Sequence, residues 1–153
     1  MKISSPNFKH RGRIPARHAF RKGNSSPALT WSDLPDGTRE LALVCDDPDA
    51  PGKTWVHWVI WGIPADSKGL KAGVPKDVQL NDPKGARQGR NDFGLIGYDG
   101  PAPPPGKDHR YIFRLYALSE AVILGPTGTA ADLRRAMEGK ILEEAEVVGI
   151  YST

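Results

Sequence analysis

The sequence predicts a mostly β protein that forms one domain over residues 1–153. Its 153 residues and 39% hydrophobic content are enough to bury one core without a metal ion or a disulfide. The 14 prolines and 17 glycines fall between apolar runs, where such residues end short strands. The clearest apolar runs repeat with a period of two residues, which is typical of strands.

The first expected strand lies within NSSPALTWSDLPDGTRE, residues 24–40. We expect a loop, then a short strand, then a turn in which Pro35 sets φ and Gly37 accepts a positive φ. The apolar run LALVCD, residues 41–46, follows directly. Because this run is short and continuous, it predicts a strand that is buried on both faces.

Two later segments, residues 55–63 and 109–118, show the period of two most clearly. Alternation along a strand assigns successive side chains to opposite faces. In the first segment one face would hold Trp55, His57, Val59 and Trp61, and the other Val56, Trp58 and Ile60. In the second segment one face would hold His109, Tyr111, Phe113, Leu115 and Ala117, and the other Arg110, Ile112, Arg114, Tyr116 and Leu118.

The remaining chain predicts less regular structure. Residues 64–108 are rich in Gly, Pro, Lys and Asp, and we expect loops with short pieces of strand. Thr129 and Asp132 have the spacing of a capping box, which predicts a helix that ends near Gly139. For ILEEAEVVGIYST, the last 13 residues, we expect a helical turn and then a short strand from Glu146.

Positive charge is concentrated at the N-terminus. The chain carries a net charge of +3, yet its first 32 residues hold seven Lys or Arg and no acid. This segment is either a solvated basic face or a surface for phosphates and other anions. The first alternative is favoured, and nucleic acid is not expected as a partner, because no aromatic side chains alternate with the basic ones. The six of them that could meet an anion are Lys9, Arg11, Arg13, Arg17, Arg21 and Lys22.

The sequence favours a cytoplasmic location. The single cysteine, Cys45, lies in an apolar run, where a buried and inert thiol is the usual state. The N-terminal residues lack the apolar stretch of a secretory signal. No run approaches the roughly 20 apolar residues that a membrane helix needs, so no stable membrane insertion is expected.

Polar side chains occur in three segments where core residues would be expected. Asp47 and Asp49 follow a buried strand, His57 lies among tryptophans, and His109 and Tyr111 begin a third strand. A fixed acid beside two imidazoles and a phenol would make a pocket for an anionic group. Each residue also has a structural explanation, since the histidines and the tyrosine can belong to the core and the aspartates to a turn.

Several ordered motifs resemble one known family. DPDAP, WVHW and GYDGPAPPPGKDHRYIFRLYAL are similar to motifs of the phosphatidylethanolamine-binding protein (PEBP) family, in its bacterial and archaeal Raf kinase inhibitor-like branch. NSSPALTWSDLP, RNDFGLIGYDG and EAEVVGIYS resemble further segments of that branch. The similarity extends from about Phe8 to Tyr151.

The resemblance implies an antiparallel Greek-key β-sandwich with short peripheral helices and a small cavity for anionic groups. The ligand-binding residues that it implies are Asp47, Asp49, Pro51, Trp55, His57, Gly100, Pro103, Pro104, His109 and Tyr111. Arg110 belongs to the motifs too, but it alternates with His109, so we expect it to brace the fold or the cavity rim. Val56 stands where animal members often have a second histidine, and Thr153 ends the chain where they continue with a helix.

Three functions fit these residues. The first is a non-enzymatic regulatory protein that binds a phosphate-bearing small molecule or headgroup and modulates a protein partner. The second is a protease or kinase inhibitor that acts through surface loops, in particular residues 101–106. The third is a metal-assisted hydrolase using Asp47, Asp49, His57 and His109, although this spacing is a weak metal signature. No cofactor is expected, and the resemblance is compatible with a homodimer.

Overall fold

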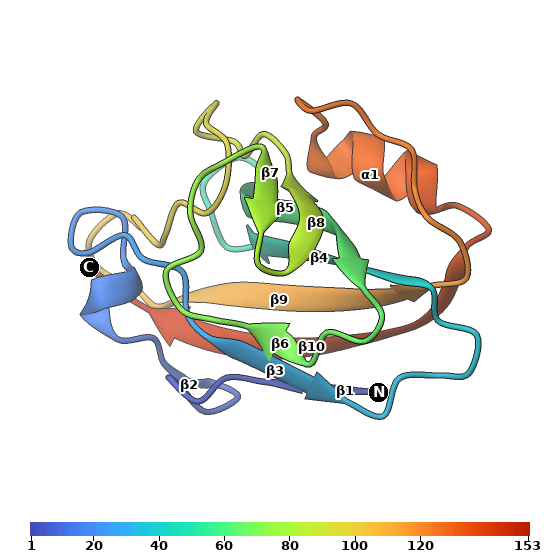
Figure 1. Cartoon of the computed structure of the whole chain (residues 1–153). Coiled ribbons are helices and arrows are strands. Elements are labelled where there is room, and N and C mark those ends of the chain that lie inside the picture. The colour runs from blue at the N-terminus through green and yellow to red at the C-terminus, as the bar shows by residue number, and fades with distance from the viewer.

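The structure is a computed structural model that describes residues 1–153. Two β-sheets form its layers (Figure 1). The large sheet has the order β2-β10-β9-β4-β5-β8-β7, and the small one has the order β1-β3-β6. The strands are β1 (Lys2–Ser4), β2 (Gly12–Arg13), β3 (Leu29–Ser32), β4 (Glu40–Asp47), β5 (Trp55–Pro64), β6 (Gly69–Leu70), β7 (Gln79–Asn81), β8 (Lys84–Gln88), β9 (His109–Leu118) and β10 (Ile141–Tyr151).

This architecture confirms the predicted mostly β protein with short peripheral helices. The helices are α1 (Ala130–Met137) and a 3₁₀ turn, η1 (Ala16–His18). In the large sheet β9 returns to lie beside β4, outside the β4-β5-β8 group, which is a Greek-key order. No helix is long and apolar enough to cross a membrane.

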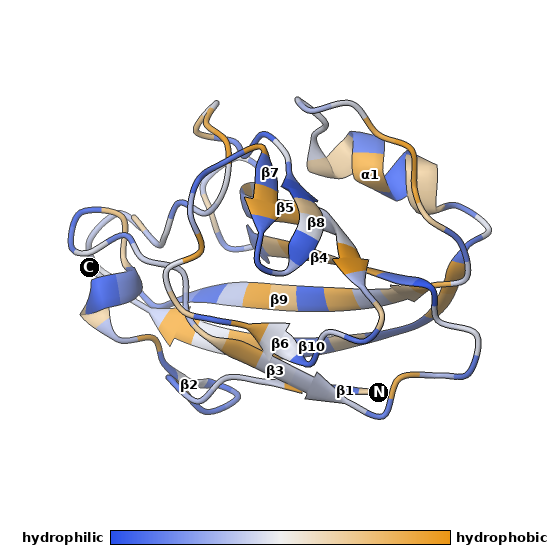
Figure 2. Cartoon of the chain, viewed as in Figure 1, coloured by the Kyte–Doolittle hydropathy of each residue, from blue (hydrophilic) through white to orange (hydrophobic).

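The main core fills the space between the two sheets. Leu29 and Trp31 of β3 and Leu70 of β6 meet Leu43 of β4 and Phe113 of β9, and all five are buried. A second core lies on the opposite face of the large sheet, under α1. Hydrophobic segments, orange in Figure 2, accordingly occur in strands of both sheets and in α1. The strand β4 is buried on both faces because it contributes to both cores, as its continuous apolar run predicts.

Several local predictions are confirmed. The face assignment of β9 is correct, since Tyr111, Phe113 and Leu115 enter the main core while Tyr116 and Leu118 enter the second one. The capping box at Thr129 is formed with Asp132, and the helix ends before Gly139, whose φ is +76°. The turn after β3 and the short strands within residues 64–108 are also present.

The face assignment of β5 is wrong beyond His57 because the strand contains two β-bulges. Cys45 pairs with Trp58 and Asp46 with Val56, so His57 is an extra residue without an opposite partner. A bulge turns two consecutive side chains to one side of a sheet. The inner face therefore carries Trp58 and Ile60 next to His57, and the outer face carries Val56, Val59 and Trp61.

The second bulge of β5 lies at Gly62. Trp61 and Gly62 together oppose Ala42, because Leu41 pairs with Ile63 and Leu43 with Ile60. Gly62 has a φ of +69°, a conformation that L-residues with a Cβ avoid. The bulge returns Ile63 to the main core, where it is fully buried.

The expected helical turn near residue 141 is also wrong, because β10 is one strand from Ile141 to Tyr151. Its backbone pairs with β9 over the full length, from Leu118 to His109. Glutamates and alanine favour a helix locally. The ladder to β9 overrides this preference, and it is supported by alternation, since Ala145 and Val147 pack on the main core while Glu146 is exposed.

We expect Gly62→Ala to lower the free energy of unfolding by about 1–2 kcal/mol, because alanine in the left-handed region is strained. The oxygen of Gly85 would also lie 3.3 Å from the new Cβ. Gly125→Ala is the matched control, since nothing lies within 4 Å of its new Cβ and its φ is not positive. Urea denaturation would measure both variants, and equal stabilities would contradict the role of the bulge.

Candidate functional site

A cavity of about 340 Å³ opens at one end of the large sheet. It lies where β4 ends at Asp47 and where β5 and β9 begin, so three strands deliver polar residues to one place. The proline-rich loop before β9 forms another wall. The lining residues are Asp47, Ala50, Pro51, Trp55, His57, Phe93, Ala102, Pro103, Pro104, His109 and Tyr111.

Asp47 and His109 form a buried pair in this cavity. Nδ1 of His109 donates to Oδ2 of Asp47 over 2.7 Å, and both side chains are almost completely buried. The other carboxylate oxygen of Asp47 accepts the backbone N–H of Asp49 over 2.7 Å, which holds the turn after β4. The Nδ1 contact is the only hydrogen bond of the His109 ring within the protein, so Nε2 is free to contact a ligand.

His57 enters the cavity from the first bulge of β5. Its Nδ1 donates to the backbone oxygen of Asp99 over 2.6 Å. The ring packs in edge contacts with Phe93 and Tyr111, at centroid distances of 5.6 and 5.2 Å. Burial lowers the pKa of His57, although its contact with Asp99 partly opposes this effect, so the ring is neutral at pH 7.

Two hydrogen-bond donors of the cavity have no partner. The hydroxyl of Tyr111 and Nε1 of Trp55 are both buried and unpaired. Burial raises the pKa of Tyr111, and the nearby Asp47 raises it further, so the phenol keeps its proton. A buried donor without an acceptor destabilises a protein unless a ligand or water satisfies it. These donors therefore indicate where a ligand with acceptor atoms would bind.

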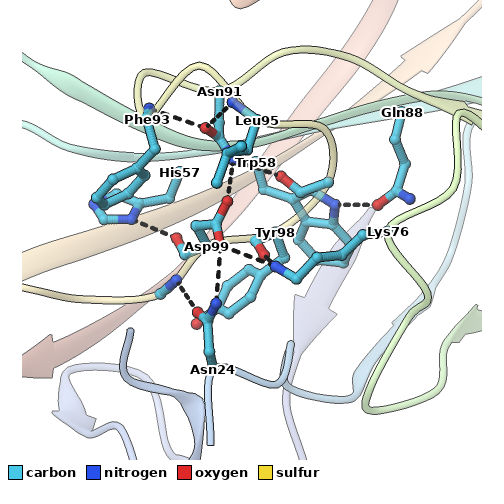
Figure 3. A network of polar contacts seen from close by, with 12 residues as sticks. Asn24, His57, Trp58, Lys76, Gln88, Asn91, Phe93, Leu95, Tyr98 and Asp99 are labelled. Carbon is cyan, nitrogen blue, oxygen red and sulfur yellow. Dashed lines mark hydrogen bonds and ion pairs between the residues drawn. The ribbon is translucent and has the colours of Figure 1, made fainter. Parts of the chain in front are cut away.

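Behind the cavity wall, Asp99 is the centre of a polar network (Figure 3). Its buried carboxylate accepts from Asn24 over 2.8 Å, from Lys76 over 2.9 Å and from Asn91 over 2.7 Å. Its backbone N–H donates to the oxygen of His57, whose ring returns the contact to the oxygen of Asp99. Four segments that are distant in sequence are thereby joined at the residue that orients His57.

The N-terminal turn η1 supports the same wall. The phenol of Tyr98 donates to the oxygen of His18 over 2.7 Å, and the N–H of Phe20 donates to Pro101 over 2.9 Å. Phe20 also stacks on the cavity residue Phe93, with ring centroids 4.6 Å apart. Gly100 is required at this contact, because a Cβ there would lie 1.9 Å from the oxygen of His18.

The cavity contains eight of the residues that the resemblance implies and omits Asp49 and Gly100. Asp49 instead forms a two-pronged ion pair with the guanidinium of Arg110 at 2.9 Å for both contacts. Gly100 lies behind the wall. The lining residues that sequence reasoning missed are Ala50, Ala102 and Phe93. All three lie inside quoted motifs, Phe93 in RNDFGLIGYDG, but only the contacts of Phe93 with Trp55 and His57 place it at the cavity.

The four residues considered for a metal site do not form one. The structure contains no group of three or more His, Cys, Asp or Glu side chains that could hold a metal ion. Asp47 is bound to His109, and Asp49 is bound to Arg110 on the other side of the β9 strand.

Comparison with known proteins supports the resemblance. A family model described as phosphatidylethanolamine-binding protein matches residues 4–152. This chain belongs to the phosphatidylethanolamine-binding protein family. Within the PEBP family it is 49% identical to a UPF0098 protein of Methanothermobacter thermautotrophicus, over 99% of this chain and 98% of that one.

Solved structures of the PEBP family agree with the fold. The crystal structure of Escherichia coli YbcL, described as a member of the mammalian PEBP family, is similar with a TM-score of 0.89 and 34% identity, over 99% of this chain and 98% of that one. The PEBP homologue CT736 of Chlamydia trachomatis has a TM-score of 0.89 and 32% identity, over 99% and 97% of the two chains. The β-sandwich is therefore shared by this member and its relatives.

We expect Asp99→Asn to lower the free energy of unfolding by about 2–3 kcal/mol, because it removes a buried charge that accepts three hydrogen bonds. The matched control is Asp77→Asn, since Asp77 is exposed and its carboxylate forms no ion pair. The control should change stability by less than about 0.5 kcal/mol in urea denaturation. Equal effects of the two substitutions would contradict the supporting role of Asp99.

The ion pair of Asp49 and Arg110 predicts a pH dependence. The guanidinium lowers the pKa of Asp49 from 3.8 to about 2. Because the folded-state pKa is the lower one, the pair stabilises the protein above pH 3.8, and this contribution disappears as the pH falls towards 2. Asp49→Asn should therefore be less stable than the wild type near neutral pH and equally stable at the acid end. Urea denaturation over this range, with the exposed Asp66→Asn as control, would measure it, and a difference that persists in acid would disprove the assignment.

Proposed function

We propose that this protein is a non-enzymatic regulatory protein of the Raf kinase inhibitor-like type, whose cavity binds a phosphate-bearing small molecule or headgroup. The observation that carries the proposal is the set of unsatisfied groups around one cavity. The hydroxyl of Tyr111 and Nε1 of Trp55 have no acceptor, and Nε2 of His57 and of His109 have no partner. The oxygen atoms of a tetrahedral anion can accept from both donors together, and a proton carried by the ligand can satisfy an imidazole nitrogen.

The charge around the cavity favours an anionic ligand. Two carboxylates at this end are paired with cations, Asp49 with Arg110 and Asp108 with Arg13, and Asp47 is hydrogen-bonded to His109. In contrast, the exposed cations Arg17, Arg21, Lys22 and Lys107 have no ion pair. The first three belong to the segment that η1 anchors to the cavity wall. They would attract an anion and its carrier by long-range electrostatics.

The lining supports binding without covalent chemistry. It contains no serine, threonine, cysteine or lysine side chain, and Cys45 is buried in the main core. Burial raises the pKa of the Cys45 thiol well above its usual value, which keeps it protonated and unreactive. These features favour a pocket that binds a ligand over a hydrolytic centre.

Inhibition of a protease or kinase is the second candidate function. The observation that favours it is the dual role of the loop before β9, where Pro103 and Pro104 line the cavity while Pro105, Gly106 and Lys107 are exposed. A ligand in the cavity would thus contact the same loop that a protein partner would meet. Slower turnover of one protease in a serine-protease panel would support this function, and no inhibition at micromolar protein would count against the protease form.

The cytoplasmic location and the homodimer stay predictions. Relatives of this chain include LppC of Mycobacterium tuberculosis, whose name describes a lipoprotein, at 39% identity over 97% of this chain and 71% of that one.

The test of the proposed function is a histidine-resolved NMR titration with inorganic phosphate and phosphoethanolamine. Saturable shifts of His57 and His109 should appear in the wild type, because both Nε2 atoms face the ligand. His109→Ala should abolish the saturable shift of His57, whereas Asp66→Asn, at an exposed residue outside the cavity, should preserve it. No shift at millimolar ligand would mean that the cluster is architectural.

A further inference from the structure

The two imidazoles of the cavity differ in what they can offer a ligand. Nδ1 of His57 contacts the backbone oxygen of Asp99 over 2.6 Å. A carbonyl oxygen can only accept a hydrogen bond, so the proton of the neutral ring is on Nδ1. Nε2 of His57 is then a bare acceptor. Figure 3 shows the ring held from the side of the Asp99 network, which leaves Nε2 as the atom without a protein partner.

The surroundings of His57 keep the ring neutral. The side chain is only 3% exposed, and uncharged rings of Phe93 and Tyr111 pack against it. Protonation would place a charge in a site that water hardly reaches. The ring can therefore accept a hydrogen bond from a ligand but cannot readily donate a second one.

The carboxylates near His57 are already engaged with other groups. They come from β4 and from the loop that precedes β9, and they are the charges that would otherwise favour a protonated ring. Each one has its own cation or donors. The pairs are Asp46 with Arg114 and Arg134, Asp47 with His109, and Asp99 with Lys76, Asn24 and Asn91.

We propose that the cavity binds a phosphate group strongly only when the same ligand also presents a hydrogen-bond donor to Nε2 of His57. This inference rests on the proposed function. The hydroxyl of Tyr111 and Nε1 of Trp55 would donate to the phosphate oxygens. The ligand's own donor is either the P–OH of a monoprotonated phosphomonoester or an ammonium group beside a phosphodiester.

A phosphodiester without a donor satisfies the cavity incompletely. All of its free oxygens are acceptors, so Nε2 of His57 would be buried against them without a hydrogen bond. Nε2 of His57 would then be a buried acceptor that faces a phosphate oxygen, which is also an acceptor. Leaving such an atom unpaired weakens binding by about tenfold or more. The cavity should therefore discriminate between phosphates by their donors and not by their charge alone.

Calorimetry with three ligands tests this inference. Methyl phosphate has a P–OH when monoprotonated, glycerophosphoethanolamine has an ammonium group, and dimethyl phosphate has no donor. We expect dimethyl phosphate to bind about tenfold or more weakly than the better of the other two. The affinity for methyl phosphate should fall as the pH rises above about 6, where the P–OH ionises, while that for the ammonium diester should stay constant from about pH 6 to 8.

The two sources of the donor are separated by this pH profile. Binding of methyl phosphate that is tight only below about pH 6 identifies a phosphomonoester. Binding of glycerophosphoethanolamine that is equally tight from about pH 6 to 8 identifies an aminoalkyl headgroup. Equal affinities for all three ligands would overturn the inference and leave the proposed function intact. If none of the three binds, the proposed function fails, and the inference fails with it.

Nitrogen-15 NMR of the histidine rings gives a second and independent readout. Nε2 of His57 should stay unprotonated in the complex with the tighter ligand, because it accepts a hydrogen bond from the ligand while the proton remains bonded to the ligand. This readout distinguishes a neutral ring with a monoprotonated phosphate from a protonated ring with a dianion, which pH dependence alone cannot separate. Protonation of Nε2 upon binding would overturn the inference.

A matched pair of variants completes the test. In His57→Gln the side-chain amide can present either an oxygen or an NH₂ group, so the ratio of the affinities for methyl phosphate and dimethyl phosphate should fall towards one. Lys107→Ala removes an exposed cation outside the cavity lining and should change both affinities by the same factor. If His57→Gln does not fold, the affinity ratio and the nitrogen-15 readout of the wild type still decide the question.

Discussion

The structure depends on the bulge that places His57 and Trp58 on the same side of β5. In a regular strand these neighbours would face opposite layers. Here Trp58 fills the main core, where its Nε1 donates to Gln88 over 2.7 Å, and His57 enters the cavity. The bulge also turns Val59 and Trp61 towards α1. One backbone irregularity thus sets the packing of both cores and the orientation of the site.

A second constraint keeps the negative charge of Asp99 outside the cavity. Asp99 uses its carboxylate to join Asn24, Lys76 and Asn91 behind the wall, while its backbone oxygen holds His57 on the other side. The negative charge is therefore balanced outside the cavity. Asp47 lies inside it, where one carboxylate oxygen accepts from His109 and the other accepts from the backbone N–H of Asp49. Two unpaired donors, the acceptor Nε2 of His57 and apolar rings then line the cavity, which suits a ligand that brings acceptors together with a donor of its own.

The N-terminal segment has a structural role that its charge alone did not indicate. The turn η1 is fastened to Pro101 and Tyr98, and Phe20 stacks on Phe93 of the cavity. The prediction of a solvated basic face is correct for the charged side chains of this segment, which are exposed. Its apolar and backbone groups form part of the wall, and the basic residues are thereby brought to the end of the molecule that contains the cavity.

By itself, the sequence determined the strands with a clear period of two, the proline and glycine corners and the chemical groups at the strand ends. It predicted Asp47, His57, His109 and Tyr111 as neighbours through a family resemblance. Tertiary structure decided the face of β5 beyond His57, the strand from Ile141, the inclusion of Phe93 and the exclusion of Asp49. These outcomes depend on partners far along the chain. The physical reason is that the bulge in β5, the pairing of β10 with β9 and the tautomer of His57 are all set by hydrogen bonds. In each of these bonds the partner atom belongs to a segment far along the chain, which local sequence does not specify.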